Sequence, residues 1–206
     1  MAVAGMYRTG KSYLLNRMLL NRSDGFGVGP TINPCTKGLW MWGRPIVHRT
    51  SRDEILNVFI VDSEGMGACE EDSTHDSRVF ALTMLLSSCF IYNSMGIIDE
   101  NAISSLGLVV GLGKYLQIRA NQANSEEESR NSLFSPEFYW VVRDFSLQLI
   151  NKEGMPIQGT DYLENALSLQ TDKNSDSVDN RNAIRKAIKE YFPKRDCITL
   201  VRPLTN

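Results

Sequence analysis

One short segment near the N-terminus constrains the fold more than any other part of this chain. Residues 5–12 read GMYRTGKS, which fits the pattern G-x-x-x-x-G-K-S/T. In this pattern two glycines let the backbone curl so that successive N–H groups point at a phosphate, and the following helix adds its partial positive charge. Lys11 can then reach the β- and γ-phosphates of a nucleotide, and the Ser12 hydroxyl can ligate Mg²⁺. The segment predicts a phosphate-binding loop; the alternative is a glycine-rich turn before an ordinary helix.

Composition narrows the class of protein. The 206 residues are 42% hydrophobic and 22% charged, with a formal net charge of -2, which suits a soluble globular domain and excludes disordered or fibrous classes. The near-neutral charge argues against a general nucleic-acid binder. The four cysteines are widely spaced, so we expect a reducing compartment and neither a zinc site nor a disulfide scaffold. We also expect no secretion signal, and no apolar run reaches the ~18 residues that cross a bilayer.

The apolar pattern predicts helices and strands that alternate along the chain. Helices are expected over about 11–20, 76–91, 102–118, 160–169 and 181–191. Strands are expected over 39–42, 55–61, 138–142 and 197–201, whereas 2–4 is strand-like but too short for a strand. The polar stretches 24–34 and 121–132 are expected to be a mobile loop and a disordered insertion. This order predicts a three-layer α/β domain with a mostly parallel central sheet flanked by helices.

A second motif follows the apolar run 55–61. Asp62, Ser63, Glu64 and Gly65 form a D-x-x-G pattern. An acidic residue there can hold the Mg²⁺ shell, and the glycine N–H can approach a γ-phosphate and move away once that phosphate is lost. Thr36, on the loop between the two motifs, lies where a second Mg²⁺-ligating hydroxyl is needed; an exposed loop threonine is the alternative.

The strand expected at 138–142 is followed by Arg143 and Asp144. Ligands bind at the carboxyl edge of open α/β sheets, and a carboxylate there can accept both N1–H and the N2 amine of guanine. Adenine offers no such pair of donors. The dipeptide alone leaves an ordinary Arg–Asp surface pair as an equal alternative.

Together these motifs resemble those of the guanylate-binding proteins, large GTPases of the dynamin superfamily. The matching segments are GMYRTGKSYLLNRML, PCTKGLWMW, DSEGMG, FALTMLLSSCFIYNSMG, WVVRDFSL and LVRPL. They run from Gly5 to Pro203 in the family's order, and TKGLWMW and VVRDFSL are far more specific than a phosphate loop. The related atlastins share an arginine-bearing phosphate loop and an RD motif, but their first switch does not look like TKGLWMW.

The resemblance implies a role for each matching residue. Those implied to bind the nucleotide are Gly5, Met6, Tyr7, Arg8, Thr9, Gly10, Lys11, Ser12, Asp62, Ser63, Glu64, Gly65, Met66, Arg143 and Asp144. Three of them have implied catalytic roles: Arg8 as a built-in arginine finger, Glu64 as the organiser of water, and Gly65 as the sensor of the γ-phosphate. The implied Mg²⁺ ligands are Ser12, Thr36 and, through water, Asp62.

The resemblance also bears on domain organisation. It implies one P-loop GTPase domain over 1–206, cut in its first strand and before the guanine cap, which begins near Arg202. The family's helical C-terminal region and any prenylation box are expected to be absent from this chain. One residue departs from the family's pattern: Pro34 stands where a serine typically relays the proton of the water.

We therefore expect Mg²⁺-dependent binding and hydrolysis of GTP, with Mg²⁺ as the cofactor. The expected partners are GTP, GDP and a second copy of the GTPase domain, with no nucleic acid and no direct membrane segment. A cytoplasmic location is expected, with endomembranes as a further site for a full-length protein. The alternative, motivated by Pro34, is a GTP-dependent assembly module with weak or no hydrolysis. A P-loop kinase or ATPase is a third reading, which Asp144 disfavours.

Overall fold

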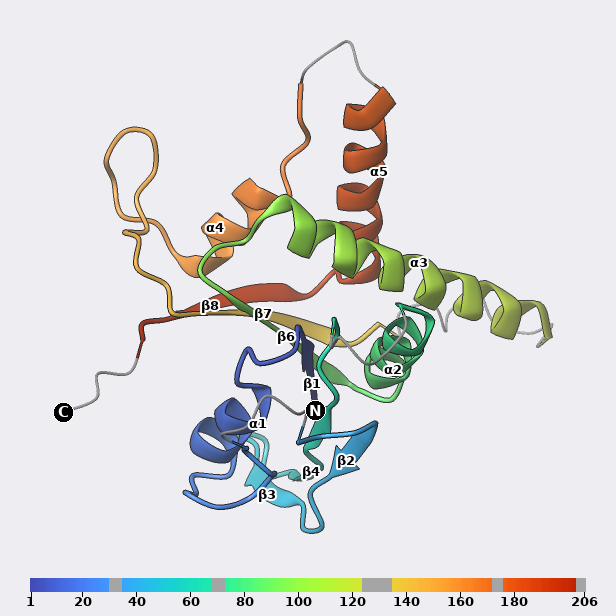
Figure 1. The fold of residues 1–206 in the computed structure, drawn as a ribbon, viewed down its shortest axis with the longest axis vertical. Helices are drawn as coiled ribbons and strands as arrows, with labels where there is room; N and C mark the ends of the chain where they lie inside the picture. The colour runs from blue at the N-terminus through green and yellow to red at the C-terminus, as the bar shows by residue number, and fades with distance from the viewer. Residues whose placement is uncertain (30–34, 68–72, 124–134, 172–175, 203–206) are drawn as a thin grey trace. The chain divides into compact units, whose positions relative to one another are not determined.

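The computed structural model describes residues 1–29, 35–67, 73–123, 135–171 and 176–202. The chain forms two compact units, Met1–Asn93 and Ser94–Asn206, and each is described by itself (Figure 1). Both units contain strands and helices. In the part of the chain that is described, no helix combines the length and the apolar character needed to span a membrane.

The sheet of the first unit is organised around β1 (Ala2–Gly5), a short and fully buried strand. It pairs in parallel with β5 (Val61–Ser63) on one side and with β6 (Cys89–Met95) on the other. The edge strand β2 (Leu39–Met41) joins β5 in antiparallel fashion. The expectation that 2–4 is too short for a strand is therefore wrong. Because strands on both sides satisfy its backbone groups, even this short segment is stable as a strand.

The first unit also contains the helices that flank β1. A helical segment follows the predicted phosphate loop as expected, with one α-helical turn, α1 (Lys11–Leu14), and a π-helical turn, η1 (Leu15–Leu19). The prediction of a helix over 76–91 is wrong in its second half. Helix α2 (Ser73–Leu85) ends early, and β6 begins at Cys89.

Aromatic packing explains this difference. Phe80 of α2 makes edge-to-face contacts with Phe90 and Tyr92 of β6, at centroid distances of 5.5 and 5.7 Å. All three side chains are buried. An apolar run of this kind fits a buried strand as well as a helix, so periodicity alone did not separate the helix from the strand that it packs against.

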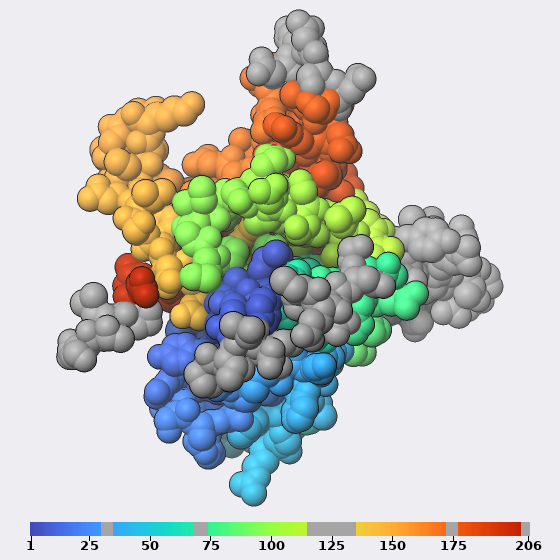
Figure 2. Space-filling view, in the orientation of Figure 1, coloured from blue at the N-terminus to red at the C-terminus, as the bar shows by residue number. Residues whose placement is uncertain are grey.

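The strand predicted over 55–61 is two strands. β4 (Ile55–Val58) pairs with β3 (Ile46–Arg49) in an antiparallel hairpin, whereas β5 belongs to the main sheet. The hairpin is exposed rather than buried, and in Figure 2 its light-blue residues project at the surface. Asp62 consequently lies inside β5 and not after its end.

The second unit confirms the elements predicted for the C-terminal half. β7 (Glu137–Arg143) and β8 (Arg195–Leu200) pair in parallel, and the helices are α3 (Glu100–Ala123), α4 (Gly159–Ala166) and α5 (Asp176–Tyr191) (Figure 1). Helix α3 includes the first residues of the expected insertion at 121–132, and positions 124–132 lie outside the described residues. Parallel pairing predominates in the main sheet, which confirms the predicted α/β class.

An ion pair links α3 to α5 within the second unit. The buried Arg185 guanidinium donates to both carboxylate oxygens of Glu100, at 2.9 and 2.6 Å. This hydrogen bonding is the main reason why the pKa of Glu100 lies below its ordinary value. A buried guanidinium that loses its partner keeps its desolvation cost, so the pair matters more than an exposed one.

We expect Glu100→Gln to lower the free energy of unfolding by about 1–3 kcal/mol at neutral pH. The partial exposure of the carboxylate keeps this effect smaller than for a fully buried pair. Because the folded pKa is lowered, the stabilisation is present above the unfolded pKa of about 4.3 and is lost as pH falls through the folded value. Urea unfolding over a series from neutral to acid pH should show the difference from the original chain shrinking. Glu153→Gln, in an exposed turn, is the matched control. A difference that stays constant into acid would contradict the assignment.

Candidate functional site

The predicted phosphate loop turns sharply between β1 and α1. Arg8 and Gly10 both have left-handed backbone conformations, with φ of 59° and 76°. The carbonyl of Met6 accepts a hydrogen bond from the Thr9 hydroxyl at 2.8 Å, and Asn93 donates its side-chain amide to the carbonyl of Thr9 at 3.0 Å. These contacts hold the loop in a tight curl. Asn93 had no signal in the sequence, because its partner lies far along the chain.

Lys11 is buried at the base of this loop. Its Nζ donates to the carbonyl of Met6 at 3.1 Å, and the residue is 6% exposed. Burial lowers the pKa of Lys11 to about 8, against the opposing attraction of Asp62 and Glu64. A phosphate bound in the loop would favour the charged form of the amine.

Oxygen atoms from three separate segments converge beside Lys11. The Oδ2 atom of Asp62 accepts hydrogen bonds from the hydroxyls of Ser12 at 2.6 Å and Thr36 at 3.0 Å. The two hydroxyl oxygens are 3.4 Å apart. Asp62 is fully buried, and burial is the main reason why its pKa is raised. Its other oxygen, Oδ1, is buried with no hydrogen-bond partner among the described residues.

This oxygen cluster fits a small hard cation. Mg²⁺ prefers oxygen ligands and usually keeps several waters, so one or two hydroxyls and a nearby carboxylate can hold it. The orphaned Oδ1 of Asp62 is an acceptor that a metal-bound water would satisfy. The described residues contain no cluster of His, Cys, Asp and Glu that could hold a metal ion by themselves. The structure thus brings together the predicted ligands Ser12, Thr36 and Asp62.

The D-x-x-G segment lies directly against the phosphate loop. The backbone N–H of Tyr7 donates to the carbonyl of Met66 at 2.7 Å, and the N–H of Met66 donates to the carbonyl of Gly5 at 3.2 Å. At Gly65 a Cβ atom would lie 2.5 Å from the Cα of Tyr7 and 2.8 Å from the Nζ of Lys11. The segment and the loop are therefore in contact at Gly65, where a larger side chain would overlap the backbone of Tyr7.

Glu64 is buried in the same segment, at 4% exposure. Its Oε2 accepts the backbone N–H of Gly38 at 2.7 Å, and its own N–H donates to the carbonyl of Gly38 at 2.8 Å. Its Oε1 is buried without a hydrogen-bond partner in the described part of the chain. A buried, unsatisfied carboxylate oxygen is costly, which marks Glu64 as a candidate for contact with water or ligand.

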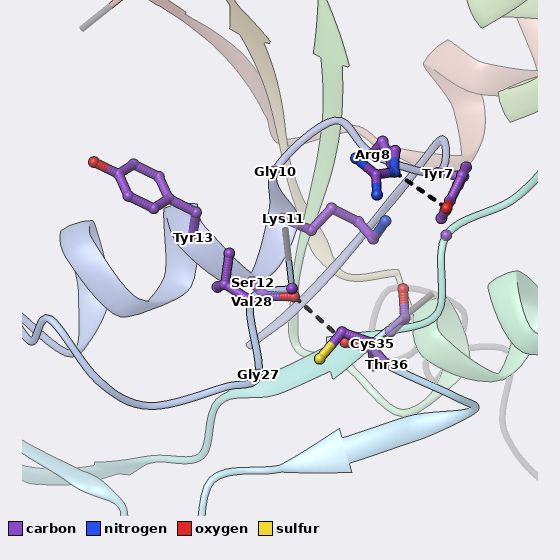
Figure 3. A pocket seen from close by; sticks show the side chains of 13 residues that line it. Tyr7, Arg8, Gly10, Lys11, Ser12, Tyr13, Gly27, Val28, Cys35 and Thr36 are labelled. Carbon is purple, nitrogen blue, oxygen red and sulfur yellow. Dashed lines mark hydrogen bonds between the residues drawn. The ribbon is translucent and has the colours of Figure 1, made fainter. Parts of the chain in front are cut away.

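Several of these residues line a pocket of about 220 Å³ (Figure 3), whereas Asp62 and Glu64 are not among its lining residues. The lining includes predicted site residues, among them Lys11, Ser12, Thr36, Ser63 and Gly65. It also includes five residues that the sequence analysis did not assign to the site. The missed residues are Tyr13, Gly27, Val28, Gly29 and Cys35. The glycine-rich composition of 24–34 was the available signal, but it predicted only a mobile loop.

Arg8 also lines the pocket and is exposed. Its Nε donates to the hydroxyl of Tyr7 at 3.1 Å, and its guanidinium lies 5.6 Å from the centre of that ring. Figure 3 shows this pair on the same side of the pocket as the end of the Lys11 side chain. The guanidinium lies against Tyr7 at the surface of the pocket, where it could reach a bound ligand.

Arg143 and Asp144 belong to the second unit. Arg143 is the last residue of β7, one residue beyond the predicted end of the strand, and its carbonyl accepts the N–H of Gly96 at 2.7 Å. Asp144 follows with a left-handed φ of 53°, a conformation that aspartate tolerates better than most residues. Both side chains are half-buried, and Arg202 is exposed. Pro34 lies outside the described residues.

Gly65→Ala should destabilise the chain by about 1–3 kcal/mol, because the new methyl group overlaps the backbone of Tyr7. Thermal unfolding measures this effect. Gly43→Ala is a matched control, since a Cβ there meets nothing within 4 Å. Equal melting temperatures for the two variants would show that the D-x-x-G segment does not pack on the loop in this way.

Comparison with known proteins shows the family of the chain. The family model described as "Guanylate-binding protein, N-terminal domain" matches residues 1–206. The chain is 41% identical to guanylate-binding protein 7 of Homo sapiens, with 100% of the chain and 32% of the relative covered. It is 42% identical to guanylate-binding protein 3 of Mus musculus, again with 100% and 32% covered.

Guanylate-binding protein 2 of Homo sapiens is 42% identical, with 98% of the chain and 34% of the relative covered. The chain thus spans about a third of the length of the curated relatives that it matches. Since the family model and these relatives cover the whole chain or nearly all of it, the chain belongs to the guanylate-binding protein family.

Proposed function

We propose that this chain binds GTP with Mg²⁺ and hydrolyses it to GDP and inorganic phosphate. One observation carries the proposal: the buried Lys11, the packed Gly65 and two hydroxyls line one pocket. The hydroxyls, of Ser12 and Thr36, both donate to the buried carboxylate of Asp62. The names of the relatives, which say that they bind guanylate, support guanine as the base.

The phosphates would lie in the curl of the loop. Lys11 sits at its base and would contact the β- and γ-phosphates. Ser12 and Thr36 would hold Mg²⁺ with their hydroxyls and Asp62 would hold it through water. When bound, the metal supplies positive charge that neutralises the phosphates. Gly65, between Tyr7 and Lys11, would sense whether the γ-phosphate is present.

Glu64 would orient the attacking water. Its Oε1, which has no hydrogen-bond partner among the described residues, can accept a hydrogen bond from that water. The water oxygen then bonds to the γ-phosphorus while the bond from that phosphorus to the β–γ bridging oxygen breaks. The proton that the water loses is released with the products, GDP and inorganic phosphate.

Asp144 would read the base. Its carboxylate can accept the N1–H and N2 donors of guanine as a bidentate pair, and Arg143 would complete the base motif at the end of β7. Adenine offers no matching donors and would leave the carboxylate desolvated, at a cost of about 1–3 kcal/mol. The proposal therefore includes a preference for GTP over ATP.

A GTP-dependent assembly module with weak or no hydrolysis is the second candidate. Pro34 favours it, because proline has no hydroxyl through which the proton of the water could be relayed. Binding of GTP is common to both candidates, so hydrolysis is the property that separates them.

Single-turnover hydrolysis with GTP and ATP side by side tests the proposal. We expect GTP to be hydrolysed and ATP to be a poor substrate.

A binding titration tests the phosphate loop. We expect Lys11→Ala to weaken binding of a fluorescent GTP analogue by tenfold or more, because the variant loses a charge-assisted contact of about 1.5–3 kcal/mol. Lys186→Ala, an exposed lysine on α5, is the matched control.

Each other outcome has a definite meaning. Binding of GTP without hydrolysis would favour the assembly module. Equal use of ATP would reject Asp144 as the base-reading residue. Unchanged affinity in Lys11→Ala would reject the assignment of the phosphate loop.

Arg8 would act as an arginine finger when two GTPase domains pair. Such fingers contribute about 10³–10⁵ in rate in other GTPases, and the contact is made mainly in the transition state. We expect Arg8→Ala to reduce turnover far more than affinity for GTP, and the specific activity of the original chain to rise with protein concentration. A rate per molecule that stays flat over a wide concentration range would contradict pairing, and a parallel loss of affinity would reduce Arg8 to a binding residue.

A further inference from the structure

The first turn of α2 contacts the segment that carries Glu64. The Nε2 atom of His75 lies 3.2 Å from Oε2 of Glu64. The next residue, Asp76, accepts the backbone N–H of Gly67 at 2.6 Å. Two successive residues of one helix therefore each hold a different residue of the segment 64–67. Sequence reasoning assigned no role to either of them.

The two oxygens of Glu64 have different surroundings. Oε2 lies within hydrogen-bond distance of two groups, the N–H of Gly38 and the imidazole of His75. Oε1 is buried and has no hydrogen-bond partner among the described residues. The carboxylate is thus anchored through one oxygen, and the other remains as its only unsatisfied acceptor.

This asymmetry has a consequence for catalysis. A carboxylate held by one donor can turn about its last side-chain bond, whereas a second donor on the same oxygen fixes the plane of the group. Fixing the plane also fixes the position of Oε1. Precise placement of a group that orients a reactant is worth large factors in rate, and small misplacements are costly.

We propose that His75 is a positioning residue for hydrolysis, which donates Nε2–H to Oε2 of Glu64 and so holds Oε1 toward the attacking water. The inference rests on the proposed function, since it needs Glu64 to orient that water. His75 itself touches no nucleotide and takes no proton from the reaction. Its side chain is 41% exposed, so it can be replaced without opening a cavity in the core.

The hydrogen bond predicts which replacements preserve activity. His75→Ala removes the donor, and we expect turnover of GTP to fall by about tenfold or more while affinity for a fluorescent GTP analogue stays within about twofold. His75→Gln places an amide N–H near the position of Nε2 and should restore most of the lost turnover. Thr74→Ala, an exposed neighbour on the same turn, is the matched control and should behave as the original chain does.

A double-mutant cycle separates positioning from simple support of the fold. If His75 acts through Glu64, His75→Ala should slow the chain that carries Glu64→Ala by little or nothing, because the carboxylate that it positions is already absent. A role in folding alone would make the two losses multiply. Melting temperatures of all variants, measured alongside, show that each one is folded.

The outcomes distinguish this inference from the proposed function. A chain that binds GTP and never hydrolyses it would overturn both. A chain that hydrolyses GTP, with turnover unaffected by His75→Ala, would overturn the inference alone. Turnover of His75→Gln as low as that of His75→Ala, or multiplying losses in the double-mutant cycle, would also overturn it.

Discussion

The site depends first on the parallel pairing of β1 with β5 and β6. Val3 pairs with Asp62, and Gly5 pairs with Asn93, so the ends of these strands meet at one edge of the sheet. The phosphate loop leaves β1 at that edge, and beside it Glu64 and Gly65 of the D-x-x-G segment follow the end of β5. The pairing even continues past the strands, as a bridge between Met6 and Met66. Contact between the two motifs is thus a result of sheet register.

Burial gives this edge its chemical character. It lowers the pKa of Lys11 and raises that of Asp62, so in both cases the environment disfavours the charged form. One oxygen of Asp62 and one of Glu64 also lack hydrogen-bond partners among the described residues, each at a cost of about 1–3 kcal/mol if left unsatisfied. A polyanion beside the amine and a hydrated cation beside the carboxylates would offset both costs. This is how the proposed nucleotide and its metal would stabilise the site.

The sequence predicted the parts of this site that are local. The phosphate loop and the D-x-x-G pattern each have a signature within a few residues, and the structure has β1 and β5 at these motifs. In the second unit, the strand before Asp144 was predicted in the same way. Contacts between segments had no such signature. The bonds of Glu64 to Gly38 and His75 span parts of the chain whose approach is decided by strand pairing and helix packing. The prediction of a helix over 76–91 was wrong for the same reason, because packing against β6, and not the periodicity of the sequence, decided where α2 ends.

Helix α2 connects the buried core to the segment 64–67. Phe80 packs edge-on against Phe90 and Tyr92, aromatic contacts that add to the stability gained by burying the rings. Because the middle of α2 is fixed to β6 in this way, its first turn is fixed as well, and that turn holds Glu64 and Gly67. A shift of the D-x-x-G segment on loss of a γ-phosphate must therefore either break these two contacts or move a helix that is anchored in the core. Breaking two exposed or half-buried hydrogen bonds costs less than repacking three buried rings. The contacts of Glu64 with His75 and of Gly67 with Asp76 are accordingly the ones that would break in any such switch.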